Sequence, residues 1–170
     1  MLGFVEKVEG GRPVATDEPK DYPCTIEQDF IPTVEASAPF AYLVPARYPK
    51  VTDVLRAHGL RLEKLDEPID LRMEAEEIGQ LTRSRRVFEG HQTIDLTASV
   101  TRTGLHPVPA GTVVVRTRQA LGPLAVYLLE PRSDDGLLTW NFFDDALEPG
   151  RDFPVLRIRE AAPLKTSALD

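Results

Sequence analysis

Apolar residues recur at helical spacing in two segments of the chain. In residues 49–58 they fall three and four positions apart, with Pro49 at the start and Gly59 just past the end. A proline at the first position and a glycine after the last are typical of an α-helix. Residues 119–129 show the same spacing, and Pro123 is tolerated in a first helical turn. The pattern therefore predicts two short helices.

Alternation of apolar and polar residues predicts β-strands in much of the remaining chain. The clearest case is the segment 93–101, whose apolar members are expected to face the core. These members are Ile94, Leu96, Ala98 and Val100. Further strands are predicted at 40–44, 60–62, 71–75, 112–116 and 154–158. Strand, helix and strand from 40 to 62 form a small βαβ-like unit, and the predicted fold class is α+β: a small antiparallel (mixed) β-sheet with two or three short helices packed on it.

The first 37 residues have a different composition. They contain four prolines, and eight Asp and Glu residues against three Lys and Arg. Proline at this density excludes a helix and favours extended backbone. We expect residues 1–37 to be an extended proline-rich arm or interdomain linker that lies across an α+β domain at 38–160. Residues 161–170 are expected to be a frayed tail.

Charge and composition narrow the function classes. The 170 residues carry a net charge of −7, so general affinity for nucleic-acid phosphates is not expected. The basic run 83–86 (RSRR) is too short to reverse this and is expected to be a solvated strand end or loop. Cys24 is the single cysteine, which excludes an internal disulfide. No apolar run reaches the roughly 20 residues of a membrane span, so membrane insertion is not expected, and the compartment stays unknown.

The spacing of reactive residues gives no sign of a catalytic or metal site. His58, His91 and His106 do not stand in an H-x-x-E, H-E-x-x-H or H-x-H arrangement. No serine lies in G-x-S-x-G, and Gly10-Gly11 does not lead into a helix as a phosphate loop would. No catalytic residue, metal ligand or cofactor is therefore assigned to this chain.

Two acidic pairs enclose an apolar stretch at 134–145. The spacing fails as a calcium loop, because Leu138, Thr139 and Trp140 stand where oxygen ligands would be needed. The preferred interpretation is that Ser133, Asp134 or Asp135 caps the start of a further short helix. In that interpretation the carboxylates serve structure and not catalysis.

The aromatic residues inside this stretch suggest a second role. Trp140, Phe142 and Phe143 cannot all face one side of a single short element, so at least one should be exposed or covered by residues 1–37. Exposed aromatics with a charged rim are typical of interface centres. The alternative is that all three rings are ordinary core. The candidate interface residues are Asp134, Asp135, Trp140, Phe142, Phe143 and Asp144.

Three stretches resemble a known family. At 39–65 the chain reads PFAYLVPARYPKVTDVLRAHGLRLEKL, at 108–145 it reads VPAGTVVVRTRQALGPLAVYLLEPRSDDGLLTWNFFDD, and at 153–158 it reads FPVLRI. Together they resemble the C-terminal portion of bacterial zinc carboxypeptidases of the carboxypeptidase A type. The resemblance implies a non-catalytic accessory domain that packs on the peptidase domain of the same parent chain and shapes access to it.

No position here matches the family's zinc ligands, substrate-binding arginine or glutamate base. The resemblance therefore implies a hydrolase as the parent protein, with zinc only in a catalytic domain that is absent from this chain. Two alternatives stay open. The chain can be a stand-alone peptide- or glycan-binding module with no peptidase partner, or, less favoured, an enzyme that uses carboxylates alone.

Overall fold

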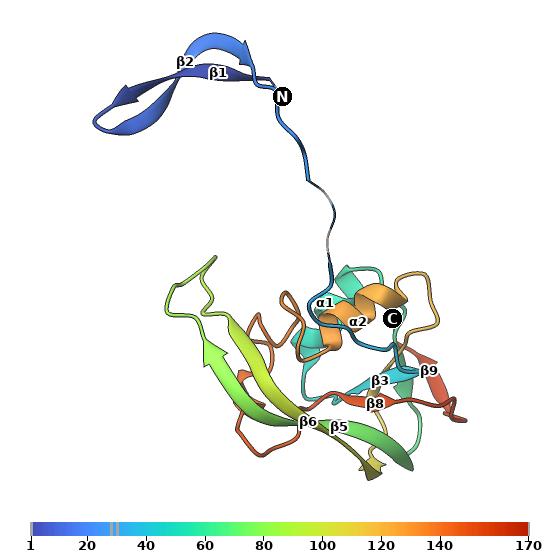
Figure 1. Ribbon diagram of the computed structural model, residues 1–170. Coiled ribbons are helices and arrows are strands. Elements are labelled where there is room, and N and C mark those ends of the chain that lie inside the picture. Colours follow the sequence, from blue (N-terminus) through green and yellow to red (C-terminus); the bar gives the residue numbers. More distant parts are fainter. Residues whose placement is uncertain (1, 28, 30, 170) are drawn as a thin grey trace. The chain divides into compact units, whose positions relative to one another are not determined.

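The computed structural model describes residues 2–27, 29 and 31–169. The chain divides into two compact units, Met1–Thr33 and Val34–Asp170. The first unit holds strands β1 (Leu2–Glu9) and β2 (Arg12–Asp21). The second holds β3 (Ala41–Val44), α1 (Pro49–Ala57), β4 (Glu63–Leu65), β5 (Ile69–Arg83), β6 (Ile94–Val108), β7 (Val113–Arg116), α2 (Gly122–Leu129), the 3₁₀-helix η1 (Asp144–Ala146), β8 (Leu156–Ile158) and β9 (Thr166–Ala168) (Figure 1).

Strands β1 and β2 form an antiparallel hairpin in the first unit. Gly10 and Gly11 both have positive φ, which is the backbone of a tight two-residue turn that matches strand twist. The sequence predicted extended backbone here but not this turn, so residues 2–21 form a hairpin where a single extended arm was expected. Its position across the second unit stays a prediction.

The second unit is built on one antiparallel sheet with the strand order β6-β5-β8-β3-β7-β4-β9. Strands β3 and β4 both pair antiparallel with β7, so they run parallel to each other on either side of it. Strands β7 and β8 flank β3 in the same way. Helix α1 connects β3 to β4, and α2 lies between β7 and β8 in the chain.

These connections make two interlocked split βαβ units, the arrangement of ferredoxin-like topologies, with the β5–β6 hairpin inserted between them. The predicted βαβ-like unit is therefore present, but β7 separates its two strands. The α+β class, with two helices and a mostly antiparallel sheet, is confirmed.

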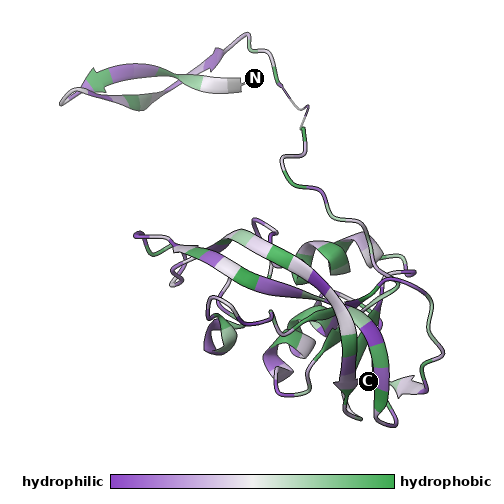
Figure 2. Cartoon of the chain, turned by 60° about the horizontal axis from the view of Figure 1, so that its bottom comes forward, coloured by the Kyte–Doolittle hydropathy of each residue, from purple (hydrophilic) through white to green (hydrophobic). Residues whose placement is uncertain are grey.

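Strand β3 is buried on both faces and divides the core into two clusters. Tyr42 and Val44 belong to the larger cluster, which also contains residues of α1 and α2. Ala41 and Leu43 belong to a smaller cluster on the other face of the sheet. In Figure 2 the apolar positions are concentrated in the helices and inner strands, whereas the β5–β6 ribbon alternates between apolar and polar colours.

The β5–β6 hairpin corrects the predicted orientation of 93–101. Ile94 and Leu96 are buried as predicted, but Ala98 and Val100 are exposed, and Val100 is 57% exposed. The register shifts at Gly79 of β5, where a Cβ would lie only 2.7 Å from the carbonyl oxygen of Ala98, and again at Thr97 of β6, which lies between the paired residues Leu96 and Ala98. A bulge of this kind changes which face the following residues occupy, and a strict period of two cannot reveal it.

Two further boundaries differ from the predicted ones. Helix α2 begins at Gly122, three residues later than predicted, and a Cβ at Gly122 would lie 1.8 Å from the carbonyl oxygen of Thr117. The close approach of these two backbones explains why glycine stands at this position. At the other end, β9 pairs with β4, so the prediction of a frayed tail is wrong for 166–168.

Candidate interface and buried ionic network

The loop that follows α2 is irregular, and no α-helix begins at Asp134. Asn141 has a φ of 68°, a left-handed conformation that interrupts helical backbone. Gly136 is packed so closely that an added Cβ would lie 2.9 Å from the Cβ of Ser133. The predicted third α-helix is therefore wrong, and only the short η1 follows the loop.

The carboxylates of this loop bind side-chain donors and do not cap a helix. Asp134 accepts a hydrogen bond of 2.9 Å from the Tyr127 hydroxyl, and this bond raises the pKa of Tyr127. Asp135 accepts one from the Trp140 indole N–H. Asp144 accepts one from Arg83 at 3.2 Å. These contacts hold the loop by its side chains, where the sequence predicted backbone capping.

The three aromatic residues of the loop occupy different environments. Phe143 is fully buried and contacts Tyr48 and Phe153 edge to face, with ring centroids 5.0 and 4.8 Å apart. Trp140 and Phe142 are half-buried. Phe143 is therefore a core residue, and its assignment to the candidate interface is wrong. Trp140 and Phe142 keep part of their surface exposed and stay candidates for an interface.

The tip of the β5–β6 hairpin adds apolar residues that the sequence analysis did not include. Val87 is 66% exposed and Phe88 is 58% exposed. The Phe88 ring lies 6.1 Å from the Trp140 ring, and the His91 ring stands edge-on to Trp140 at 5.3 Å. We call Val87, Phe88, His91 and Trp140 the aromatic edge. An apolar pair next to Glu-Gly between two predicted strands was the signal that could have identified it.

The aromatic edge is held in place by hydrogen bonds. Phe88 and His91 exchange both backbone hydrogen bonds, at 2.8 and 2.9 Å, across the tip. The imidazole of His91 bonds the Asn141 side chain at 3.1 Å, and the Asn141 amide donates to the Gln92 carbonyl at 3.0 Å. These bonds tie two segments that are about 50 residues apart in sequence, so Trp140 and the hairpin tip present one surface.

The basic run beside this edge is a solvated loop, as predicted. Arg83 ends β5 and pairs with Asp144 at 3.2 Å. Arg85 and Arg86 are exposed in the loop that follows. The aromatic edge is thus bordered by cationic side chains from the hairpin and by carboxylates from the loop after α2.

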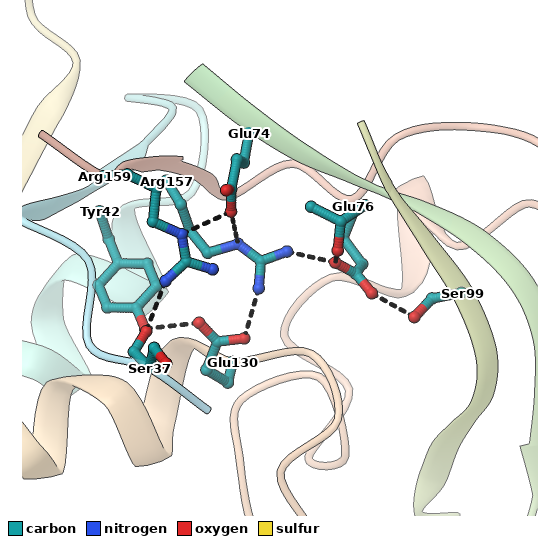
Figure 3. A network of polar contacts seen from close by, with 9 residues as sticks. Ser37, Tyr42, Glu74, Glu76, Ser99, Glu130, Arg157 and Arg159 are labelled. Atoms are coloured by element: carbon teal, nitrogen blue, oxygen red, sulfur yellow. Dashed lines mark hydrogen bonds and ion pairs between the residues drawn. The ribbon is translucent and has the colours of Figure 1, made fainter. Parts of the chain in front are cut away.

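A second polar cluster lies inside the molecule (Figure 3). Arg157 of β8 contacts Glu130 at the end of α2, at 2.8 Å, and Glu76 of β5. Tyr42 of β3 donates a hydrogen bond of 2.6 Å to Glu130. Thr101 of β6 donates one of 2.8 Å to Glu76. We call these residues, together with Ser99, which also donates to Glu76, the ionic network.

A second layer extends this network toward the surface. Glu74 lies 3.8 Å from the Arg157 side chain and 2.7 Å from Arg159. Arg159 in turn donates a hydrogen bond of 2.6 Å to the carbonyl oxygen of Ser37. Figure 3 shows Glu74 and Arg159 beside Arg157, on the side away from Ser99.

Burial and charge shift the pKa values within the network. Burial raises the pKa of Tyr42, and the neighbouring Glu130 charge raises it further. Burial would also raise the pKa of Glu76, but hydrogen bonds from Ser99, Thr101 and Arg157 outweigh it and hold that pKa below its ordinary value. Each charged group of the network is thus stabilised by the others. Because its pKa is raised, the Tyr42 hydroxyl stays protonated near neutral pH and is unsuited to act as a base.

No group of three or more His, Cys, Asp or Glu residues that could hold a metal ion occurs within the described part of the chain. The carboxylates of the ionic network are saturated by partners inside the fold. Cys24 is exposed in the first unit. No described helix is both long enough and apolar enough to cross a membrane.

Comparison with curated proteins finds relatives among fungal proteins named carboxypeptidase 2. The protein of Trichophyton rubrum is 25% identical over 143 residues, which cover 84% of this chain and 26% of the relative. That of Trichophyton tonsurans is 27% identical over 144 residues, covering 81% of this chain and 26% of the relative. A probable carboxypeptidase 2 of Arthroderma benhamiae is 29% identical over 119 residues, covering 70% and 22%.

The chain therefore spans about a quarter of the length of the curated relatives it matches. No family model matches it, and no solved structure matches it. The relatives named here are fungal, so they give no support to a bacterial origin. Their names do not mention the carboxypeptidase A type, so they give no support to that type either. What the comparisons do show is that most of this chain is similar to one part of proteins named as carboxypeptidases.

Proposed function

We propose that this chain is a non-catalytic accessory domain of a carboxypeptidase, which packs on the peptidase domain of the same parent protein and shapes access to it. The observation that carries the proposal is the coverage: more than 80% of this chain matches about 26% of fungal carboxypeptidase 2 proteins. Three quarters of each relative then remain for a catalytic domain. The zinc that the family resemblance implies would belong to that domain.

The buried charges of the second unit are consistent with the proposed non-catalytic role. Its most buried charges are bound to one another, and Arg157, with a side chain 9% exposed, is enclosed by carboxylates. Groups held in this way must stay paired with one another and have no free position for a substrate. Such a unit is suited to hold a surface rigidly against a partner.

The aromatic edge is the surface that we propose for this contact. Trp140 is half-buried and Phe88 is exposed, so both can lose further solvent contact when a partner packs on them. The carboxylates of Asp134, Asp135 and Asp144 would form its polar rim, as in interfaces with an apolar centre. Phe142 stays a candidate, while the buried Phe143 is left out of the surface.

The first experiment is to read the source gene upstream of Met1 and to express any segment that carries an H-x-x-E motif. That segment and the present chain should associate when mixed, and isothermal titration calorimetry measures the affinity. Trp140→Ser should weaken the association by about 2 kcal/mol or more, as aromatic anchors do. Leu105→Ser is the matched control, because Leu105 is 72% exposed but lies outside the aromatic edge.

Each outcome decides between the two functions. An upstream peptidase segment that binds the chain, with affinity lost in Trp140→Ser and kept in Leu105→Ser, supports the accessory role. A gene with no peptidase segment would contradict it and would favour the stand-alone peptide- or glycan-binding module. Unfolding of Trp140→Ser, seen by circular dichroism, would assign this tryptophan to the core, and Phe88→Ser would then test the surface independently.

A further inference from the structure

An open pocket in the second unit holds charges of both signs. Its volume is about 630 Å³, a size that suits a small organic ligand. Its walls come from the loop before α1, from β6, from η1 and from the segment before β8. The lining residues are Arg47, Arg102, Asp145, Ala146, Gly150, Arg151 and Asp152.

The backbone of one wall is fixed to β5. The amide of Ile78 donates to the carbonyl of Arg151 at 2.8 Å, and the amide of Gly150 donates to the carbonyl of Ile78 at 2.7 Å. Asp152 forms an isolated antiparallel bridge with Glu77 of the same strand. This wall is therefore preorganised by main-chain hydrogen bonds, which lowers the entropic cost of binding.

Two of the three arginines already have an acidic partner. Arg102 forms an ion pair with Glu77, and Arg151 pairs with Glu148 at 2.7 Å. Arg47 is different, because its guanidinium lies over the Tyr48 ring, 5.0 Å from the centroid, and is 3.4 Å from the Tyr48 hydroxyl. Among the described residues no carboxylate pairs with Arg47.

The two aspartates that line the pocket, like Arg47, have no partner of opposite charge among the described residues. No ion pair or side-chain hydrogen bond links Asp145 or Asp152 to another described residue, although both are exposed on the pocket wall. A cation and two anions thus line one pocket without neutralising each other. A ligand with both charges can satisfy them together.

The charge of the whole pocket selects the class of ligand. The lining holds three arginines and two aspartates, and Glu77 and Glu148 form ion pairs with two of these arginines. With four carboxylates near three guanidinium groups, a polyanion such as a phosphate ester would be repelled. A small zwitterion places a carboxylate beside one cation and an ammonium group beside the anions without adding net charge.

We propose that this pocket binds a free α-amino acid. The α-carboxylate lies against Arg47, whose planar guanidinium suits a carboxylate, and the α-ammonium group lies against Asp145 and Asp152. The proposal stands on the charged residues that line the pocket and on its volume, and does not depend on the proposed function. No curated relative's name assigns a ligand to this part of the chain.

The test is an NMR titration of the full chain with three related probes: L-serine, N-acetyl-L-serine and L-serinamide. L-Serine carries both charges, the acetylated form lacks the ammonium group, and the amide lacks the carboxylate. We expect saturable amide shifts at Ala146, Gly150 and Arg151 with L-serine. Binding of each of the other two should be about tenfold weaker or more, because each loses one charge-assisted contact.

Variants locate the site independently. Arg47→Gln and Asp145→Asn should each weaken L-serine binding about tenfold or more, and thermal unfolding confirms that they fold. Arg72→Gln, an exposed arginine of β5 outside the pocket, should bind L-serine unchanged. Equal affinity for all three probes, shifts confined to other residues, or binding insensitive to both pocket variants would overturn the proposal. Tighter binding of the amide than of L-serine would identify a site for cations instead.

Discussion

The ionic network and the amino-acid pocket use the same residue types in opposite ways. In the network, the Arg157 side chain is 9% exposed and has a carboxylate on each side. In the pocket, Arg47 is exposed and has no carboxylate partner among the described residues. A buried charge must be paired, whereas water can solvate an exposed one. The network is therefore complete within the fold, and the pocket retains charges that a ligand can satisfy.

Removing the centre of the network should have the largest effect on stability. Arg157→Met leaves the carboxylates of Glu76 and Glu130 buried beside an apolar side chain. Loss of one partner from a buried ion pair costs about 3–5 kcal/mol. Urea denaturation of the variant and the parent chain measures the difference in the free energy of unfolding.

The matched control removes all three charges together. Arg157→Met combined with Glu76→Gln and Glu130→Gln no longer leaves an unpaired buried charge, so it should recover part of the lost stability. A cost below about 1 kcal/mol for Arg157→Met alone would contradict the closed network and would place Arg157 with the surface charges.

The ionic network could not be predicted from the sequence, whereas helix α1 could. Local patterns predicted α1 almost to the residue, because Pro49, Gly59 and the helical spacing all lie within one short segment. Nothing local marks Glu76 or Arg157, whose hydrogen bond joins positions 81 residues apart. A pairing of this kind follows from the strand order, which no periodicity in the sequence specifies.

The sequence likewise predicted some residues of the candidate interface correctly and others not. The sequence identified Trp140 as a possible surface aromatic, and the structure leaves it half-buried. It assigned Phe143 to the same surface, although that ring packs between Tyr48 and Phe153 in the core. A local signal marked Phe88 as part of a hairpin tip, but only the pairing of β5 with β6 brings it beside Trp140.

Acid should weaken the network through Glu76. Its pKa is lower in the folded chain than its ordinary value of 4.5, so its ionised form stabilises the fold above that pH. This stability is lost as pH falls below about 4.5 through the folded-state pKa. Glu76→Gln should be less stable than the parent by about 1.5–3 kcal/mol at pH 7, the range for hydrogen bonds to a charged group.

Unfolding in urea at several pH values measures both effects. The difference between Glu76→Gln and the parent chain should shrink as pH decreases from 5 to 3. Some loss with acid should remain in the variant, because burial would raise the pKa of Glu63, but hydrogen bonds from Arg116 and Thr166 outweigh it and hold that pKa below its ordinary value. A difference that stays constant with pH would show that Glu76 contributes through shape and not through its charge.

The arginine of the pocket should matter far less for stability. Arg47→Gln removes a cation over the Tyr48 ring but leaves no buried charge without a partner. Exposed contacts of this kind contribute about 0.5–1 kcal/mol. Thermal unfolding should therefore show a small decrease in Tm, while amino-acid binding falls about tenfold or more. A loss of stability comparable to that of Arg157→Met would remove the contrast between the two clusters.

The smallest effect on the free energy of unfolding is expected from an ordinary surface ion pair. Lys165 and Glu67 lie 2.9 Å apart, with side chains 73% and 53% exposed. Because water and salt screen such a pair, and because ordering two long side chains costs entropy, Lys165→Gln should change the free energy of unfolding by less than about 0.5 kcal/mol. The measurement is urea denaturation at low and high salt, with the variant and the parent chain compared at each. If the variant lost more than about 1 kcal/mol at low salt, proximity of opposite charges alone would contribute appreciably in this fold, and burial would no longer explain the difference between Arg157 and Arg47.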